Sequence, residues 1–242
     1  MINRHIGQKR GKNMEIGSYE WMDQNYSEIR NEVREIRDYL NKKMEIGSRE
    51  EDLYKGTAIL YSNYVFKPDI MFIGINPNGG FYNQTKQKYQ ENELDPVDCL
   101  EYLEDYGGNL SNNTVDIFSK TKYFEKLGTA VKTNLFYTAT NNQNELYEFM
   151  GIINEKYNIN YQELSQKWTR KIIDIFKPRT IICEGKKVLD NICDLYNCDF
   201  EYLDNIGISK TQNMNIIGYS RLYSHIKNPS GLINAINNLD LD

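Results

Sequence analysis

The sequence predicts an α/β fold of three layers, α/β/α, with a central, mostly parallel sheet of four to five strands and an N-terminal helical extension. Short runs that are apolar throughout alternate along the chain with longer segments whose apolar residues recur at helical spacing. This alternation is typical of parallel sheets covered by helices on both faces. The runs are continuously apolar rather than alternating with polar residues, which indicates strands buried on both sides.

The N-terminal part of the chain divides into a flexible basic arm, residues 1–13, and a helical extension, residues 14–60. Apolar residues of the extension recur at steps of three and four and form one stripe on a helix of about five turns. The stripe consists of Met22, Tyr26, Ile29, Val33, Ile36 and Leu40. It covers too few heptads for a coiled coil, so we expect the helix to pack against the α/β domain of residues 61–242.

The α/β domain contains the remaining predicted elements. Strands are predicted at residues 70–75, 130–137, 180–183, 199–203 and 214–219. Helices are predicted at residues 96–105, 116–127, 143–155, 161–176 and 186–196, followed by a last helix that Gly231 opens. Residues 78–115 show little periodicity, and we expect a long loop or lid that carries the first of these helices.

The composition sets limits on location and partners. The net charge of -5 argues against a protein that coats nucleic acid nonspecifically. No apolar run approaches the length of a membrane span, and the polar N-terminus lacks the apolar centre of a signal peptide. We therefore expect a cytoplasmic protein without a membrane partner. The four cysteines show no metal-ligand spacing, and neither a metal nor a cofactor is expected.

A series of basic residues surrounds the predicted helix at 161–176 and the strand and helix that follow it. Its members are Lys167, Arg170, Lys171, Lys177, Arg179, Lys186 and Lys187. The series has two interpretations: a local positive face that binds phosphates while the whole molecule stays acidic, or a solvated helix face.

Two Asn-Pro pairs follow apolar runs in distant parts of the chain. Residues 71–80 read MFIGINPNGG, and residues 228–232 read NPSGL. In open parallel sheets, ligands bind beyond the carboxyl ends of the strands, and both motifs lie there or close to it. The sequence therefore predicts that the two motifs form opposite walls of one pocket.

The motif FIGINPN followed downstream by NPSGL resembles the uracil-DNA glycosylase superfamily, which pairs a first motif of the type GxNPG or GQDPY with a second of the type HPS or NPS. The forms with Asn76 and Asn228 are most similar to the mismatch-specific uracil/thymine branch. The segments TNL at 133–135 and IICEGKKVL at 181–189 also lie where that superfamily has related strands. The resemblance spans residues 64–240.

This resemblance implies a monofunctional DNA glycosylase that acts on DNA without metal or cofactor. Such an enzyme flips out uracil or a 5-substituted pyrimidine, hydrolyses its N-glycosidic bond and leaves an abasic site. The expected roles are base-excision DNA repair or antiviral defence against modified DNA, and a monomer is expected. Two other classes stay open: a catalytically weak member that binds DNA or a modified base, and a hydrolase of free nucleosides.

Asn76 and Asn228 would be the catalytic residues by this resemblance. The side-chain carbonyl of Asn76 would orient the attacking water, and its alternative is a turn residue that caps the strand. Asn228 stands where many relatives have histidine and would donate to the departing base more weakly than an imidazolium. His225, three residues earlier, is either a substitute for that histidine or a structural residue.

Five further residues would bind the base. Asn134 offers a donor and an acceptor to the edge of uracil, or it ties two loops by a hydrogen bond. Phe81 or Tyr82 would stack on the extruded base, or would cover the core. Asn78 replaces the tyrosine or glycine of the familiar motifs and, with Ile75, would line a pocket that lacks an aromatic gate against 5-substituents.

The start of the last predicted helix would contact DNA. Pro229, Ser230 and Gly231 form this start, where Ser230 and the following backbone amides would grip a phosphate. Leu232 would wedge into the base stack and fill the space of the flipped nucleotide. Its alternative is an ordinary buried leucine of a first helical turn.

Overall fold

The computed structural model describes residues 14–79, 94–104 and 108–241. Its central feature is one sheet of six strands in the order β2-β1-β3-β6-β5-β4. The strands are β1 (Ile70–Gly74), β2 (Val131–Asn134), β3 (Thr180–Cys183), β4 (Glu201–Leu203), β5 (Ile206–Lys210) and β6 (Asn215–Tyr219). The first four strands in that order are parallel, whereas β5 and β4 join them antiparallel. The predicted mostly parallel sheet is confirmed.

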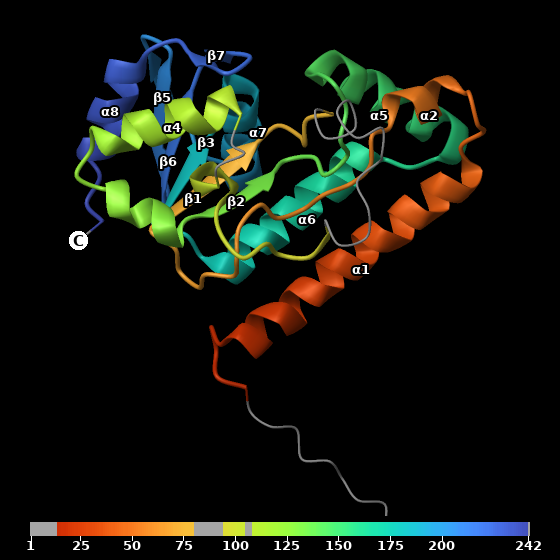
Figure 1. Cartoon of the computed structure of the whole chain (residues 1–242), viewed down its shortest axis with the longest axis horizontal. Helices are drawn as coiled ribbons and strands as arrows, with labels where there is room; N and C mark the ends of the chain where they lie inside the picture. Colours follow the sequence, from red (N-terminus) through yellow and green to blue (C-terminus); the bar gives the residue numbers. More distant parts are fainter. Residues whose placement is uncertain (1–13, 80–93, 105–107, 242) are drawn as a thin grey trace, which may run out of the picture.

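Helices cover both faces of the sheet (Figure 1). They are α1 (Tyr19–Lys43), α2 (Arg49–Leu53), α4 (Asn109–Ser119), α5 (Gln143–Tyr157), α6 (Tyr161–Phe176), α7 (Lys186–Tyr196) and α8 (Pro229–Asn237), with 3-10 turns η2 (Glu101–Leu103) and η3 (Phe124–Thr129). One apolar core lies between the sheet and α1, α5, α6 and α7, and a second between the sheet and α4, η2 and α8. The three-layer α/β/α fold is therefore confirmed.

Within the described ranges, no helix combines the length and the apolar character that crossing a membrane requires.

The N-terminal helix α1 is part of the first core. The Ser18 side chain caps it by accepting a hydrogen bond from the Trp21 amide at 3.2 Å. Five members of the predicted stripe are buried, and Ile36 is partly buried against the same core. The Tyr26 hydroxyl donates to the Leu94 carbonyl at 2.6 Å, so α1 also anchors the segment of residues 94–104. The expected packing of this helix against the α/β domain is confirmed.

The sheet has one strand more than predicted, because β5 was not recognised as a strand. Asp204 and Asn205 connect β4 to β5 with backbone φ angles of 49° and 67°. Such left-handed residues form the tight turns that join antiparallel strands. At Gly207 in β5, an added Cβ would lie 2.2 Å from Leu189 Cδ2 of α7. The strand therefore packs so closely against α7 that a side chain there is excluded.

Two of the predicted helices differ from the observed elements. The helix expected at 116–127 is interrupted, because α4 ends at Ser119 and η3 begins at Phe124. The Thr121 hydroxyl donates to the Phe118 carbonyl at 2.9 Å and accepts from the Tyr123 amide at 3.2 Å, and this local bonding competes with a continuous helix. The acidic helix expected at 96–105 is reduced, within residues 94–104, to the 3-10 turn η2.

Candidate functional site at the carboxyl edge of the sheet

The carboxyl ends of the four parallel strands lie along one edge of the sheet. The chain passes from β1 to β2 on one side, and from β3 through α7, β4 and β5 to β6 on the other. The ends of β1 and β3 therefore flank a topological switch point, which is where open α/β sheets bind ligands. Asn76 follows β1, Asn134 ends β2, Glu184 follows β3 and Arg221 follows β6. These polar residues make up the candidate site.

The amide nitrogen of Asn76 fixes the connection after β2. It donates to the Pro77 carbonyl at 2.9 Å, the Thr138 carbonyl at 3.2 Å and the Thr140 hydroxyl at 3.0 Å. Among the described residues, none donates to the side-chain oxygen of Asn76. The residue is thus a structural tie through its nitrogen, while its carbonyl oxygen stays available to a ligand or a water.

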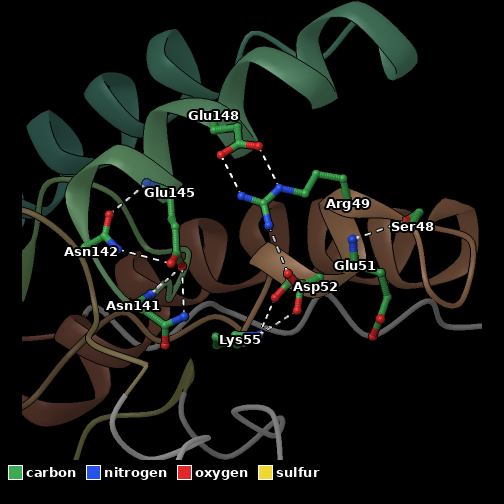
Figure 2. A network of polar contacts seen from close by, with 9 residues as sticks. All are labelled: Ser48, Arg49, Glu51, Asp52, Lys55, Asn141, Asn142, Glu145 and Glu148. Carbon is green, nitrogen blue, oxygen red and sulfur yellow. Dashed lines mark hydrogen bonds and ion pairs between the residues drawn. The ribbon is translucent and has the colours of Figure 1, made fainter.

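The segment that holds Asn76 is itself fixed by the start of α5 (Figure 2). The Thr140 hydroxyl donates to the Asn142 carbonyl at 2.8 Å. The Asn142 side chain caps α5 by accepting from the Glu145 amide at 3.0 Å, and the Glu145 carboxylate accepts from the side chains of Asn141 and Asn142 in return. This reciprocal capping holds the hydroxyl that meets Asn76.

An ion pair joins the same helix to α2. Figure 2 shows the Arg49 guanidinium facing both carboxylate oxygens of Glu148, at 2.7 and 2.9 Å. Asp52 lies on the other side of this guanidinium, at 3.1 Å. Hydrogen bonding to Arg49 lowers the pKa of Glu148. Because the pair is exposed, we expect it to orient α2 on α5 rather than to stabilise the fold strongly.

Asn134 is a largely buried residue whose side-chain amide has no partner among the described residues. The residue is 5% exposed, and its amide forms no hydrogen bond with any described residue. It lies directly over the backbone of Gly74, where an added Cβ would be 2.3 Å from Asn134 Oδ1. Only glycine at this position leaves room for the amide. Neither polar atom of this amide is among the fully buried atoms that lack a partner, so the amide reaches the surface of the site, where a ligand or a water can bond it.

A buried carboxylate next to Asn134 is a site residue that sequence reasoning missed. Glu184 is buried, and its Oε2 would lie 3.2 Å from the same Cβ position on Gly74. The Tyr102 hydroxyl donates to the other carboxylate oxygen, Oε1. Burial, and then the charge of Glu184, raise the pKa of Tyr102, so the phenol stays protonated as the donor. The available signal was a charged residue directly after the apolar run TIIC.

Lys132 compensates the charge of this cluster. Its ammonium group lies 3.9 Å from Glu184 Oε2, forms an ion pair with Glu101 and stands 4.0 Å from the centre of the Tyr102 ring. Lys132 is on β2, two residues before Asn134 and therefore on the same face of the sheet. These charged groups and the Tyr102 hydroxyl thus bond one another, and the Asn134 amide beside them has no partner among the described residues.

Asn228 has a different bonding state from Asn76, because both ends of its amide are used. Its oxygen accepts from the Gly231 amide at 2.8 Å, and its nitrogen donates to the carbonyl and the carboxylate of Asp204 at 2.8 and 2.7 Å. An added Cβ at Gly231 would lie 2.3 Å from Asn228 Nδ2. The sequence NPSG is thus explained as a helix start, with Asn as the cap, Pro in the first turn and Gly beneath the cap.

The residues predicted to contact DNA occupy the first turn of α8, and His225, considered as a substitute for the superfamily's histidine, lies on the strand before it. Leu232 is 3% exposed and packs in the second core, which is the alternative considered for it. In this conformation its side chain does not reach solvent. Pro229 and Ser230 are exposed, Gly231 is half-buried and His225 is exposed.

The base-binding candidates on the first motif have mixed positions. Ile75 is half-buried directly after β1, and Asn78 is exposed and forms a backbone bridge with Thr140. Phe81 and Tyr82 lie outside the described residues.

The structure places Asn76 and Asn134 at the ends of neighbouring strands, and Asn228 farther along the edge. Backbone bonds from Leu135 to Gly74 and from Phe136 to Ile75 keep the ends of β1 and β2 together. Asn228 follows Lys227, whose amide donates to the Ser220 carbonyl beyond β6. β6 is two strands from β1, so these two strands lie about 10 Å apart in the sheet.

Four of the seven residues of the predicted basic series contact acidic partners. Lys167 and Lys171 contact Glu32, and hydrogen bonds from these lysines and Trp168, working against the desolvation of the carboxylate, lower the pKa of Glu32 to about 2. Arg179 pairs with Asp69 and Lys186 with Asp190. The ion pairs favour a solvated face rather than a phosphate-binding face for these residues.

A surface hollow of about 280 Å³ lies between α1 and α6, lined by Trp21, Asn25, Glu28, Lys171, Asp174, Ile175 and Lys177. Lys177 precedes β3, so the hollow is at the amino edge of the sheet, opposite the candidate site.

No protein-family model matches this chain, and no curated protein matches it at a significant level. The resemblance to the uracil-DNA glycosylase superfamily therefore stays a prediction that rests on the two motifs and their positions.

Proposed function

We propose that the chain is a monofunctional DNA glycosylase that takes a pyrimidine out of DNA, hydrolyses its N-glycosidic bond and leaves an abasic site. One observation carries the proposal: Asn134, a residue that is 5% exposed, has no partner for its amide among the described residues, at the carboxyl end of β2 and next to the end of β1. A pyrimidine edge presents hydrogen-bonding groups on adjacent atoms, which a primary amide matches with its donor and its acceptor. Such an edge would give the amide the partners that the described residues do not give it.

Asn76 supplies the second part of the proposed chemistry. Three acceptors hold its amide nitrogen, so its carbonyl oxygen has a fixed direction. A carbonyl oxygen orients a water molecule but does not remove its proton as a carboxylate does. The glycosidic bond therefore breaks largely before water attacks the sugar, the bonding electrons leave with the base, and the water gives its proton to the base or to solvent.

A specific observation favours a second candidate, a catalytically weak protein that binds DNA or a modified base. Asn228 is bonded to Asp204 and to Gly231, so in this conformation it has no free donor for a departing base. Without such a donor, charge on the leaving base is less stabilised. Either candidate uses the same base-binding amide.

The experiment uses end-labelled oligonucleotides that contain uracil, a T:G mismatch, 5-hydroxymethylcytosine or glucosylated cytosine, in single- and double-stranded form. Alkali-labile sites are scored for the wild type, Asn76→Ala and Asn134→Ala, with the exposed Asn213→Ala as a matched control. We expect cleavage of one substrate that both site variants lose and the control keeps. Salt-sensitive binding without cleavage supports the binder, and hydrolysis of free nucleosides without dependence on DNA length supports a nucleoside hydrolase.

A further inference from the structure

A small hairpin next to the candidate site exposes two large apolar side chains. Strands β7 (Arg221–Leu222) and β8 (His225–Ile226) pair antiparallel, so that Tyr223 and Ser224 form the turn. Leu222 is 60% exposed and Tyr223 is 85% exposed, whereas Ile226 is buried in the second core. The hairpin is thus anchored at its base and apolar at its tip.

The turn is fixed in a conformation that is rare for an aromatic residue. Tyr223 has a φ angle of 53°, in the left-handed region that bulky residues seldom adopt. Its carbonyl accepts from Arg221 Nη1 at 2.6 Å, and the Ser224 carbonyl accepts from Asn113 Nδ2 of α4 at 2.8 Å. Two side chains therefore hold the turn, and strain of this kind is typical of functional positions.

Arg221 connects the hairpin tip to the candidate site. While one guanidinium nitrogen bonds Tyr223, Nε donates to the Glu184 carbonyl at 2.9 Å, directly after β3. In the view of Figure 1, β7 is drawn at the top of the molecule. The exposed Leu222 and Tyr223 side chains therefore belong to the rim of the carboxyl edge, where a flipped base would enter.

The charge around the hairpin favours an anionic partner. Residues 219–232 contain Arg221, His225 and Lys227 but no acidic residue, in a chain whose net charge is -5. The acidic side chain bonded to this segment is Asp204, which meets Asn228. A local positive segment in an acidic protein attracts phosphate groups.

We propose that Leu222 and Tyr223 insert into the base stack of duplex DNA beside the flipped nucleotide. This inference rests on the proposed glycosylase function, because an enzyme that extrudes a base must compensate the lost stacking. Leu232, expected to do this, is buried in the second core. The hairpin instead presents an aromatic ring and a leucine to the DNA. Hydrogen bonds already hold the backbone of its turn before binding, which lowers the entropic cost of binding.

The test compares excision from duplex and single-stranded oligonucleotides that carry the same target base. The variants are Leu222→Ala and Tyr223→Gly, and glycine suits the left-handed φ angle, so that the turn is expected to fold. Tyr223→Phe keeps the ring, and Ile46→Ala removes an exposed apolar side chain from the turn between α1 and α2 as the control. We expect excision from duplex to fall about 10- to 100-fold in the first two variants, with single-strand excision within about twofold. Tyr223→Phe and Ile46→Ala should match the wild type.

A second readout separates failure of this inference from failure of the proposed function. A duplex with 2-aminopurine beside a mismatched pyrimidine reports unstacking as a rise in fluorescence, whether or not a base is excised. A rise with the wild type that Tyr223→Gly loses supports the inference, even for a protein that cleaves none of the substrates. An unchanged rise in Tyr223→Gly and Leu222→Ala, or equal losses of excision on single and double strands, would overturn it.

Discussion

The two Asn-Pro pairs of this chain look alike in sequence and differ in what their asparagines are free to do. Asn76 uses only its amide nitrogen, which bonds three oxygens around Pro77 and Thr138–Thr140. Asn228 uses both its oxygen and its nitrogen, to cap α8 and to bind Asp204. The first pair ends a strand at the switch point of the sheet, and the second starts a helix.

The difference teaches that the bonding of a residue decides its capacity for chemistry, more than the motif around it. A side chain that already satisfies all its hydrogen-bonding groups must break bonds before it assists a reaction. We therefore expect the two asparagines to respond differently to substitution, Asn76 in activity and Asn228 in stability.

The largest expected effect is on the rate of excision, which should fall much more when Asn76 is replaced than when Asn228 is replaced. Asn76→Ala should lower excision per folded molecule by about 100-fold, because the oriented carbonyl is lost, while DNA binding persists. Asn228→Ala should lower it less than about threefold, since its amide is committed to the helix cap. Single-turnover excision and fluorescence anisotropy on the same labelled DNA measure both quantities. Equal losses in the two variants would contradict the comparison.

The next effect concerns Asn134, which lies at the end of the strand next to the one that Asn76 follows. Gly74→Ala places a Cβ at 2.3 Å from Asn134 Oδ1, so the amide must move away from its position. We expect the rate of excision to fall about 10-fold, although the substitution itself replaces no polar side chain. Gly151→Ala, where nothing lies within 4 Å of the added Cβ, is the control and should keep full activity. Wild-type rates in Gly74→Ala would remove Asn134 from the site.

The cap role of Asn228 predicts a change in stability. Asn228→Ala should lower the free energy of unfolding by about 1 kcal/mol, since the first turn of α8 loses its acceptor. Asn228→Ser keeps a cap oxygen and should lose less. Urea denaturation followed by circular dichroism measures both, and a loss in the serine variant as large as in the alanine variant would argue against capping.

The smallest effect depends on pH and on Asp204. Asn228→Asp keeps an oxygen for the Gly231 amide but sets a carboxylate against the Asp204 carboxylate, which Asn228 contacts at 2.7 Å. Repulsion raises the affinity of this carboxylate pair for one proton in the folded state. The variant should therefore gain stability relative to the wild type as the pH falls from about 7 to about 4. Thermal unfolding at both pH values checks the sign, and a difference that does not vary with pH would contradict it.

Much of the fold could be predicted because its elements have strong local patterns. The helix α6 was predicted at its observed bounds, and the stripe of α1 was recognised from its spacing. The strand β5 was not predicted. The turn before it depends on the left-handed conformation of Asp204 and Asn205, and neither residue is a glycine that would have indicated such a turn. A short strand with a glycine near its start resembles a loop.

The candidate site could be predicted only in part. Asn76 was found because it directly follows an apolar run, and Asn134 because the segment TNL at 133–135 resembles a strand of the superfamily. The bonds of Asn228 could not be foreseen, since Asp204 lies 24 residues away in the sequence. Whether Leu232 is buried or exposed depends on how α8 packs on the sheet. Glu184 follows an apolar run as Asn76 does, so the same rule applied evenly would have found it.

The bond between Tyr26 and the Leu94 carbonyl limits how far this protein divides into separable modules. It ties the N-terminal helix to the same segment that carries Tyr102 over Glu184. A chain trimmed to begin at residue 61 would lose this anchor together with the apolar stripe of α1. Neither shortening the protein to its α/β core nor transplanting that core into a fusion would preserve the covered face of the site. Helix α1 therefore supports the segment that covers the site. An engineered form of the protein has to retain both the helix and this segment.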